Sequence, residues 1–408
     1  MSTRSKLVVV GASLAGIRAV EGARKAGFDG SISLVGAEQH LPYDRPPLSK
    51  AFLEGPCDPP YFRSESEIAD ELDVRLVLGA PAEKLNASER TILIGGEEIS
   101  YDGLVIATGA TARSLPNAKD LQGVHTLRTL DDAIAVREAL DAGARTVVVG
   151  AGFIGSEVAS GARKRDLPVT IVEANPTPLV RSVGEVMGDA CSALHLANGT
   201  DLRCGVSVES VEGNSRVERV RLTDGTVLEA DLVVVGVGAE PATQWLEGSG
   251  LELDNGIVCD ENLATTVPGV YAAGDVARWY NPIFGRHMRL EHWSSAAGQG
   301  AAAGAAAAMP ECAQPFETIP YFWSDWYDSR IQFVGVPDCD EVEIVLGERD
   351  SGSFVALYRS EDRVAGVLAL NKQREIMKFR ALIARRASWS DALSFARTRQ
   401  QLATKGTA

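Results

Sequence analysis

Two glycine-rich turns, each between an apolar strand and a helix, constrain the fold more than any other feature of this sequence. In the first copy, the apolar run Leu7–Val10 leads into the turn Gly11–Gly16, which reads GASLAG, and then into a helical pattern. A second apolar strand, Ile32–Val35, ends close to the acidic Glu38. A strand, a glycine turn, a helix and a second strand that ends near an acid form the βαβ unit that binds dinucleotides.

The second copy lies at Thr146–Glu173 and carries the complete G-x-G-x-x-G pattern at Gly150–Gly155. Its second strand ends directly on Glu173. In the first copy Ser13 replaces the middle glycine, which usually lets the backbone approach the phosphates. Two such units imply two nucleotides, and an enzyme with two dinucleotide sites in one chain usually passes a hydride between them.

The rest of the chain is organised around these two units. Two apolar strand patterns that end in glycine, Leu104–Gly109 and Leu232–Gly238, close the two halves, and Val270–Asp275 resumes the first half after the second. Asp275 then lies at the carboxyl edge of a parallel sheet, where it can accept hydrogen bonds from the hydroxyls of a sugar or ribityl chain. From about Phe316, alternating apolar segments indicate an antiparallel meander followed by two helices.

We therefore predict an α/β protein with two Rossmann-like dinucleotide-binding domains of the glutathione-reductase type and a C-terminal α+β domain. The expected bounds are 1–110 and 240–315 for the discontinuous first domain, 111–239 for the second and 316–408 for the third. A chain of 408 residues is long enough for two or three such domains.

Composition narrows the possible functions. A net charge of −15 argues against general nucleic-acid binding, and no run approaches the roughly 18 uninterrupted apolar residues of a membrane helix. The six cysteines form no C-x-x-C pair, so their spacing supports neither a zinc site nor a local redox-active disulfide. We expect a cytoplasmic protein with no metal site, no nucleic-acid partner and no membrane association, as a monomer or a weak homodimer.

Several segments together resemble the FAD-dependent NADH:ferredoxin reductases of bacterial oxygenase systems, the putidaredoxin, rhodocoxin and biphenyl-dioxygenase ferredoxin reductase type. The resemblance covers nearly the whole chain. Its markers are PYDRPPLSK at Pro42–Lys50, Ala107-Thr108-Gly109, Gly150–Gly155 with Glu157, Ala273-Gly274-Asp275 and YFWSD at Tyr321–Asp325. It implies a flavoprotein oxidoreductase that takes a hydride from NADH onto FAD and passes electrons singly to an iron–sulfur ferredoxin that serves an oxygenase.

The resemblance also implies the cofactor-binding residues, with FAD in the first unit and NADH in the second. The FAD-binding set is Gly11, Ser13, Leu14, Ala15, Gly16, Ala37, Glu38, Arg45, Lys50, Ala82, Ala107, Thr108, Gly109, Arg128, Gly274, Asp275, Glu291, His292 and Trp293. The NAD-binding set is Gly150, Gly152, Phe153, Ile154, Gly155, Glu157, Glu173 and Gly238. The family commonly carries an acid where Ala37 stands, so whether Ala37 or Glu38 meets the adenosine ribose stays open.

Three residues are expected to serve the chemistry. In the family, the ammonium of Lys50 pairs with the carboxylate of Glu157, and the two border the nicotinamide pocket. Trp323 resembles the tryptophan of the flavin–nicotinamide site, where a flat indole can shield the transferred hydride. Separately, the charge of Glu173 would repel a 2′-phosphate and no Arg or Lys follows in Ala174–Leu179, so NADH is expected to be preferred over NADPH.

Other flavoprotein classes fit less well. Reductases of the thioredoxin or glutathione type need a cysteine pair beside the flavin, and NADH oxidases and peroxidases need one reactive cysteine in the region that is Pro46–Lys50 here. An NADH-binding redox-signalling flavoprotein of the apoptosis-inducing-factor type shares the Pro-Leu-Ser-Lys segment and stays an alternative. Another NADH-dependent flavin reductase is the remaining alternative.

A basic stretch near the C-terminus is the candidate docking surface for the ferredoxin. Asn371–Ser388 carries six basic residues against one acidic residue, a net charge of +5. Ferredoxins of this kind are usually acidic, and two acidic proteins repel unless one bears a local patch of opposite sign. We expect docking near Lys372, Arg374 and Lys378, while a solvated helix face without a partner stays an alternative. At helical spacing four apolar residues face inward: Ile376, Phe379, Leu382 and Ile383.

Overall fold

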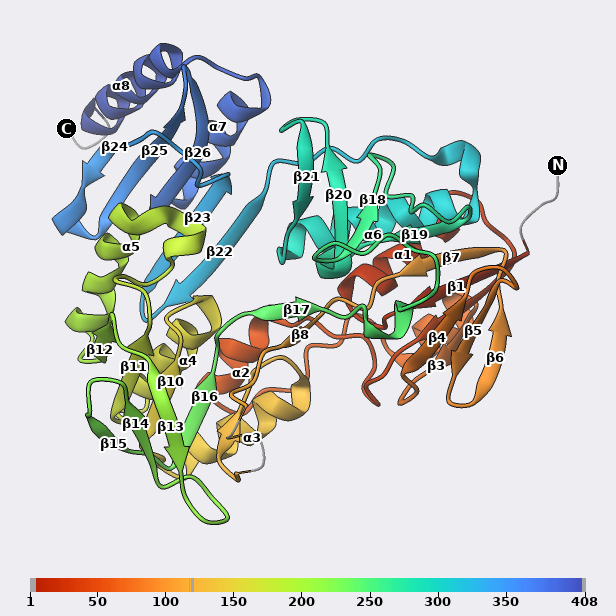
Figure 1. Ribbon diagram of the computed structural model, residues 1–408. Coiled ribbons are helices and arrows are strands. Elements are labelled where there is room, and N and C mark those ends of the chain that lie inside the picture. The colour runs from red at the N-terminus through yellow and green to blue at the C-terminus, as the bar shows by residue number, and fades with distance from the viewer. Residues whose placement is uncertain (1–4, 117, 119–120, 406–408) are drawn as a thin grey trace. The chain divides into compact units, whose positions relative to one another are not determined.

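The computed structural model describes residues 5–116, 118 and 121–405, and this part of the chain divides into two compact units (Figure 1). Unit 1 comprises Met1–Arg45, Pro59–Thr111 and Ala239–Thr318. Unit 2 comprises Pro46–Asp58, Ala112–Gly238 and Ile319–Ala408. Each unit contains one of the two glycine turns.

A five-stranded parallel sheet forms the centre of unit 1, in the order β19-β7-β1-β2-β3. Its strands are β1 (Lys6–Val10), β2 (Ser31–Val35), β3 (Val74–Val77), β7 (Gly103–Ile106) and β19 (Val270–Ala272). The inner strands are almost continuously apolar because a parallel sheet is covered on both faces. The pairing of β19 with β7 confirms that the chain returns to its first sheet after the inserted half.

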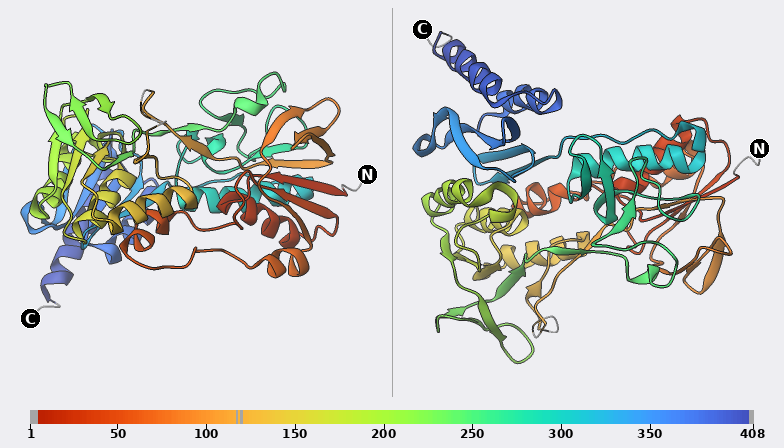
Figure 2. Two further views of the ribbon diagram at one scale, coloured as in Figure 1. Left: turned by 90° about the horizontal axis from the view of Figure 1, so that it is seen from below. Right: turned by 45° about the horizontal axis from the view of Figure 1, so that its top comes forward.

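Helices α1 (Leu14–Lys25) and α6 (Trp293–Ala308) lie side by side against this sheet (Figures 1 and 2). Their backbones approach so closely that only glycine fits at the contact. A Cβ atom at Gly300 would lie 2.3 Å from the carbonyl oxygen of Ala15, and one at Gly304 would lie 1.9 Å from that of Ala19. The alanine- and glycine-rich sequence of α6 therefore reflects helix packing. Within the described residues, no helix is long and apolar enough to cross a membrane.

Smaller elements complete unit 1. One antiparallel sheet consists of β4 (Ala82–Asn86), β5 (Thr91–Ile94) and β6 (Glu97–Ser100), and a mixed sheet consists of β18 (Ile257–Cys259), β20 (Ala277–Asn281) and β21 (Arg286–Arg289). The short strands β8 (Ala110–Ala112) and β17 (Ala239–Pro241) pair where the chain leaves and re-enters the unit. The short helices are η2 (Glu67–Glu71), η3 (Gln244–Leu246), η4 (Gly274–Val276) and η5 (Pro310–Cys312).

Unit 2 repeats the parallel architecture, in the strand order β12-β11-β10-β16-β9. The strands are β9 (Val124–His125), β10 (Thr146–Val149), β11 (Val169–Glu173), β12 (Asp201–Cys204) and β16 (Leu232–Val235). The helices of this part are α3 (Leu130–Asp141), α4 (Phe153–Arg163) and α5 (Val180–Ala197). A three-stranded antiparallel sheet is added by β13 (Val208–Glu212), β14 (Arg219–Leu222) and β15 (Val227–Glu229). The segment that contains Lys50 forms η1 (Pro46–Ser49) and α2 (Ala51–Glu54).

The C-terminal part of unit 2 is an antiparallel sheet in the order β22-β23-β26-β25-β24, with two helices (Figures 1 and 2). Its strands are β22 (Tyr321–Trp326), β23 (Ser329–Gly335), β24 (Glu341–Glu348), β25 (Ser353–Ser360) and β26 (Arg363–Leu370), and η6 (Arg349–Ser351) joins β24 to β25. The helices are α7 (Gln373–Ala384) and α8 (Trp389–Lys405). The sheet shares an apolar core with α5, in which Met187 and Cys191 meet Phe333 and Tyr358.

The α/β class with two dinucleotide folds and a C-terminal α+β part is confirmed by these sheets. The expected bounds of three separate domains stay a prediction, because the contacts group the second nucleotide fold with the C-terminal part.

Candidate functional site

The first glycine turn brings the start of α1 close to the carboxyl ends of β1 and β7. Gly11 has a φ of +117°, and a Cβ atom there would lie 2.1 Å from the carbonyl oxygen of Ala107. A Cβ atom at Gly16 would lie 1.8 Å from the carbonyl oxygen of Gly11. Ser13 precedes α1 in an extended conformation and makes no side-chain capping bond. The first N–H groups of α1 therefore have no side-chain cap, as a helix end that binds a pyrophosphate requires.

Arg45 joins two other predicted FAD-binding residues, Ser13 and Glu38, and Tyr43 into one cluster within unit 1. Its guanidinium donates to Glu38 Oε1 at 2.6 Å, to Ser13 Oγ at 3.2 Å and to the hydroxyl of Tyr43 at 3.0 Å. Burial acts to lower the pKa of Arg45, but Tyr43 and Glu38 together raise the pKa above its ordinary value. The Tyr43 hydroxyl donates to the second oxygen of Glu38, so both carboxylate oxygens are engaged, whereas Ala37 is exposed. The choice between Ala37 and Glu38 at the ribose stays a prediction.

The loop at the end of β19 is tied to helix α6. The N–H of Gly274 donates to Gln299 Oε1 at 2.8 Å, and this bond holds the η4 turn that carries Asp275. In the first turn of α6, Ser295 is 1% exposed and its hydroxyl has no hydrogen-bond partner among the described residues. A buried orphan hydroxyl at a helix start fits a site that a polar ligand completes.

The residues that precede and begin α6 are also fixed within unit 1. Trp293 Nε1 donates to Asp44 Oδ1 at 2.7 Å, and Glu291 accepts from Arg289 at 2.8 Å. Burial lowers the pKa of His292 to about 4, although Asp275 acts in the opposite direction. The imidazole is therefore neutral at pH 7.

The second glycine turn has a backbone geometry similar to that of the first. Gly150 has a φ of +101°, and a Cβ atom there would lie 2.4 Å from the carbonyl oxygen of Gly236. Gly152 precedes α4 with open space around it, the nearest atom to a Cβ being 3.9 Å away. Ile154, in the first turn of α4, is 39% exposed. The turn therefore offers an uncapped helix start beside an exposed apolar side chain, which fits a dinucleotide.

Glu173 is buried at the end of β11, and each of its carboxylate oxygens accepts from a nitrogen donor. It accepts from the N–H of Ala151 at 2.7 Å, in the glycine turn, and from the N–H and Nδ2 of Asn175 at 2.8 and 2.6 Å. It is 8% exposed and forms no ion pair within the described residues. A buried carboxylate without a cation gives this end of the strand a negative potential.

The predicted pair Lys50 and Glu157 forms within unit 2. Lys50 Nζ lies 2.8 Å from Glu157 Oε1, and the side chain of Glu157 is 4% exposed against 19% for Lys50. Glu157 lies on α4, at the start of the second turn of this helix. Lys50 lies between η1 and α2. The structure therefore places a buried ion pair beside the second nucleotide motif.

Trp323 lies on β22, whose side chains alternate between two faces. Ser324 points to α4 and reaches Glu157, so Trp323 is on the opposite face of the strand. There its ring stacks on that of Tyr321, with centroids 5.9 Å apart, and Arg330 lies 5.8 Å from its ring centroid. The structure does not bring Trp323 onto the same face of β22 as the Lys50–Glu157 pair.

The remaining predicted residues are distributed between the units. In unit 1, Leu14 and Ala15 begin α1, Ala82 begins β4, and Ala107, Thr108 and Gly109 follow β7. In unit 2, Arg128 precedes α3, Phe153 and Gly155 lie in the first turn of α4, and Gly238 follows β16. Sequence reasoning assigned no role to Ser49, Ser324 or Asn175, which contact Glu157 or Glu173, because no local pattern marks them.

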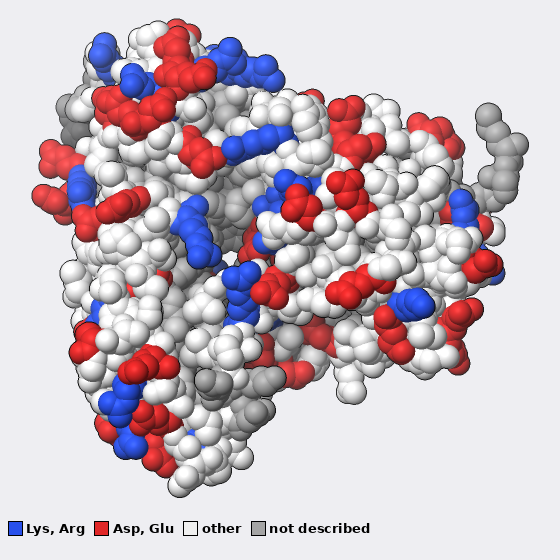
Figure 3. Space-filling view, in the orientation of Figure 1, with Lys and Arg blue, Asp and Glu red and all other residues white. Residues whose placement is uncertain are grey.

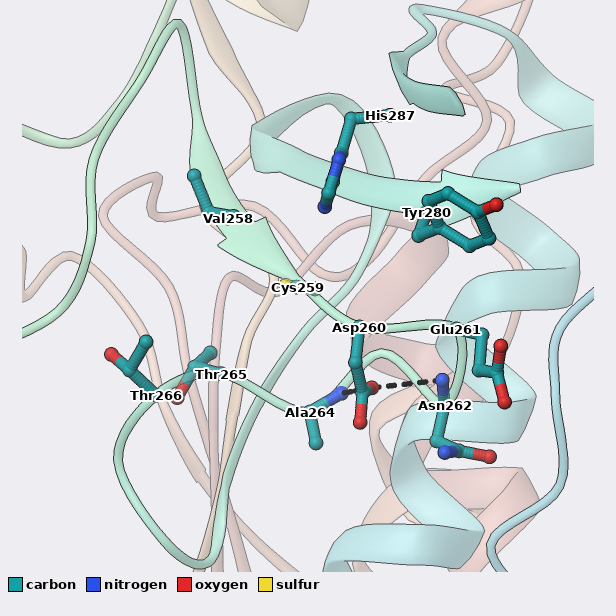
Figure 4. Close-up of a pocket in the computed structure, with 10 residues that line it drawn as sticks. All are labelled: Val258, Cys259, Asp260, Glu261, Asn262, Ala264, Thr265, Thr266, Tyr280 and His287. Atoms are coloured by element: carbon teal, nitrogen blue, oxygen red, sulfur yellow. Dashed lines mark hydrogen bonds between the residues drawn. The ribbon is translucent and has the colours of Figure 1, made fainter. Parts of the chain in front are cut away.

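The thiols and acidic groups elsewhere suggest no second centre. Burial raises the pKa of Cys191 and Cys259 to about 12 and that of Cys204 to about 11. Among the described residues, no group of three His, Cys, Asp or Glu side chains could hold a metal ion. An open groove of about 480 Å³ lies beside β18 and β20, between Asp260 and His287, and contains none of the predicted site residues (Figure 4).

Comparison with known proteins gives two family matches. Residues 5–300 match the pyridine nucleotide-disulphide oxidoreductase family, and residues 321–403 match the reductase C-terminal family. The chain is 36% identical to rhodocoxin reductase of Rhodococcus erythropolis, over 93% of this chain and 89% of that protein. It is 34% identical to putidaredoxin reductase of Pseudomonas putida, over 94% of this chain and 92% of that protein.

Solved structures show the same likeness. The reductase in the covalent putidaredoxin reductase–putidaredoxin complex matches with a TM-score of 0.90 at 32% identity, over 98% of this chain and 100% of that chain. The ferredoxin reductase for the CYP199A2 system of Rhodopseudomonas palustris matches with a TM-score of 0.89 at 33% identity, over 96% and 99% of the two chains.

Proposed function

The chain belongs to the pyridine nucleotide-disulphide oxidoreductase family, and from this premise we propose that it is an NADH-dependent ferredoxin reductase that serves an oxygenase. It is an oxidoreductase that uses FAD and NAD(H). The observation that carries the proposal is the buried Lys50–Glu157 ion pair. Its carboxylate lies on α4, the helix that follows the second glycine turn. Relatives that are named as ferredoxin reductases and match along nearly the whole chain support the acceptor.

FAD is assigned to unit 1. The glycine turn and the uncapped start of α1 would hold the pyrophosphate, and the Arg45–Glu38 cluster would order the wall beside it. Asp275 would accept hydrogen bonds from the ribityl hydroxyls, and the orphan hydroxyl of Ser295 would find its partner at the start of α6. When bound, FAD supplies the conversion of a two-electron hydride into single electrons, which an iron–sulfur acceptor needs.

NADH is assigned to unit 2. The uncapped start of α4 at Gly152 would hold its pyrophosphate, and the exposed Ile154 and Phe153 would give it an apolar wall. The negative potential at Glu173 disfavours a 2′-phosphate. Lys50 and Glu157 would border the nicotinamide and orient it. Trp323 lies on the other face of β22 from this pair, and its role in shielding the hydride rests on the family resemblance alone.

The ferredoxin is proposed to dock at α7, near Lys372, Arg374 and Lys378. Ile376, Phe379, Leu382 and Ile383 are all buried beneath the helix, as the spacing predicts. Arg374 is exposed and forms no ion pair within the described chain, whereas Lys378 shares Glu375 with Arg399, with distances of 2.9 Å. Figure 3 shows basic side chains over this end of unit 2, with acidic ones beside them. Arg374 is therefore less neutralised than Lys378.

The expected domain bounds, a cytoplasmic location and a monomeric or weakly dimeric state are part of the same proposal. The five cysteines whose side chains are described are free thiols, which suits a reducing compartment. The side chain of Cys312 lies outside the described part.

The first experiment identifies the flavin and tests the ion pair. The purified protein should be yellow and release FAD on denaturation, and anaerobic NADH should remove its visible absorption. Glu157→Gln should slow this reduction by about tenfold or more, with the FAD content unchanged, because an uncharged side chain no longer holds the Lys50 ammonium. Glu185→Gln, an exposed change on α5, is the matched control. Release of FMN, or an unaltered rate in Glu157→Gln, would contradict the assignment.

A further inference from the structure

The carboxylate of Glu157 is held by two serine hydroxyls in addition to Lys50. Ser49 Oγ donates to Oε2, and Ser324 Oγ donates to Oε1, the oxygen that also faces Lys50 Nζ at 2.8 Å. Ser49 is 6% exposed and Ser324 is fully buried. Each carboxylate oxygen thus has a neutral donor of its own, which fixes the plane of the carboxylate.

The direction of the Ser324 bond is set by Trp326. The indole N–H of Trp326 can only donate, and it donates to Ser324 Oγ at 2.8 Å. The hydroxyl proton of Ser324 is then available for Glu157, so the bonds run in one direction from Trp326 through Ser324 to Glu157. Trp326 is itself fully buried, and its ring stacks on His195 with centroids 4.6 Å apart. The chain of bonds therefore starts from a rigid group.

The position of the Lys50 ammonium depends on this carboxylate. Within the described residues, its other polar contact is the carbonyl oxygen of Pro46, at 3.4 Å, which is long for a hydrogen bond. A lysine side chain has four rotatable bonds, so a carboxylate free to turn would let the ammonium move as well. The two serine hydroxyls order the Glu157 carboxylate, and this carboxylate in turn orders the Lys50 ammonium.

We propose that Ser49 and Ser324 are positioning residues, which fix the Glu157 carboxylate and through it the Lys50 ammonium for hydride transfer from NADH. This proposal rests on the proposed function of the Lys50–Glu157 pair. Neither serine has to touch a nucleotide. Their role is to hold one orientation of a charged pair that would otherwise have several.

The test compares Ser49→Ala and Ser324→Ala with a matched control on the same helix as Glu157. Ser160 is buried on α4, and its hydroxyl accepts from the backbone N–H of Tyr327 at 2.5 Å and forms no hydrogen bond to Glu157 or Lys50 within the described residues. Ser160→Ala therefore removes an equally buried hydroxyl and leaves Glu157 untouched. For each holoprotein, the rate constant of flavin reduction at saturating NADH, the dissociation constant for NADH and the thermal midpoint are measured.

The expected result is a split between rate and binding. Ser49→Ala and Ser324→Ala should each lower the reduction rate constant roughly tenfold, the loss typical of a loosened reacting geometry, with NADH affinity changed less than about twofold. Ser160→Ala should lower the thermal midpoint at least as much, with the rate constant unaltered. If the two serine variants lose no more rate than Ser160→Ala at equal loss of stability, the positioning role is wrong.

A second readout does not depend on activity. The indole N–H proton resonance of Trp326, assigned by NMR in the holoprotein, should shift in Ser324→Ala and also in Glu157→Gln, because the bonds are coupled through Ser324. Glu185→Gln, the exposed control on α5, should leave that resonance in place. An unmoved resonance in Glu157→Gln would overturn the bond chain. Failure of wild-type flavin to react with NADH, with the resonance shifting as expected, would instead overturn the proposed function alone.

Discussion

Glu173 is a single buried charge that we propose selects NADH over NADPH. Its carboxylate is bonded to the glycine turn through Ala151 and to Asn175, and no cation neutralises it within the described chain. A ribose hydroxyl can donate to such a group, whereas a 2′-phosphate would be repelled. We propose that the preference for NADH comes from this one side chain, whose position is locked by its neighbours.

Replacing Glu173 with Gln and Ala174 with Arg should narrow the preference for NADH over NADPH. The change removes the repulsion and adds a guanidinium that can bind a phosphate, so kcat/KM with NADPH should rise by about tenfold relative to that with NADH. Ala174→Gln, which adds a long uncharged side chain at the same place, is the control. Equal use of both cofactors by the unaltered protein would contradict the role of Glu173.

At the scale of single residues, local sequence patterns identify candidate site residues, whereas contacts between residues far apart in the sequence cannot be predicted. The glycine turns and Glu173 are readable because each acts through the strand or helix that it terminates. The pairing of Lys50 with Glu157 came only from the family resemblance. Ser49 and Ser324 reach Glu157 across 108 and 167 residues of sequence, and their contacts exist only once η1 and β22 are packed against α4.

Helices α1 and α6 pack with their backbones in close contact. This contact depends on glycines that let one helix backbone touch the other. Gly304→Ala should lower the free energy of unfolding by about 2 kcal/mol, because the new methyl group would meet the carbonyl oxygen of Ala19 and force the helices apart. Gly161→Ala is the control: it is also a buried helical glycine, but its Cβ would lie at an ordinary 3.6 Å from Leu53. Chemical denaturation measures both, and equal effects would contradict the packing argument.

Helix α7 carries the prediction on docking. Arg374→Glu combined with Lys378→Gln should slow reduction of an acidic ferredoxin by about tenfold at low ionic strength and flatten the dependence on salt. Reduction of ferricyanide, a small acceptor that needs no protein docking, should change much less. The control combines Arg75→Glu and Lys84→Gln, an identical charge change at exposed positions of unit 1. If both double variants slow the ferredoxin equally, only the net charge matters and docking lies elsewhere.

Helix α5 makes unit 2 sensitive to acid through His195. This imidazole is fully buried between the hydroxyls of Tyr327, at 2.7 Å, and Ser156, at 3.1 Å, and burial lowers its pKa to about 4. Between the ordinary pKa of about 6.5 and pH 4, the unfolded chain binds a proton that the folded chain does not. The contribution to stability is therefore complete above pH 6.5 and is lost as the pH falls towards 4.

That loss should amount to about 3 kcal/mol over the window, from a pKa difference of about 2.5 units. His195→Gln keeps a donor and an acceptor but does not titrate, so its denaturation midpoint should fall less steeply between pH 6.5 and 4.5. The exposed His287→Gln is the control. Parallel pH profiles for His195→Gln and the unaltered protein would show that His195 is not the group responsible.

Elements with strong local periodicity are predictable from this sequence, and those that depend on partners are not. The meander strands β23 to β26 and the two helices α7 and α8 follow one another in the order that the alternating and helical patterns predict. Strand β22 was not predicted, because it mixes aromatic and polar residues instead of alternating apolar with polar ones. One of its faces carries Ser324, which contacts Glu157, and the other carries Trp323.

For the whole molecule, the sequence predicts two dinucleotide folds and a C-terminal α+β part, and the sheets confirm this class. The duplication was visible because each fold carries its own glycine turn. The grouping of the C-terminal sheet with the second fold was not visible, since it rests on an apolar core between α5 and strands more than a hundred residues later. The net charge of −15 also hides the basic surface of α7, which only a local count reveals.

The central claim is that this chain takes electrons from NADH and delivers them to an iron–sulfur ferredoxin. The most direct test is the anaerobic rate at which NADH reduces putidaredoxin and rhodocoxin in the presence of catalytic amounts of the purified protein. We expect repeated turnover with at least one of them, with two ferredoxins reduced for each NADH consumed, and much slower turnover with NADPH. A flavin that NADH reduces but that holds its electrons in a long-lived charge-transfer complex, with neither ferredoxin reduced, would contradict it.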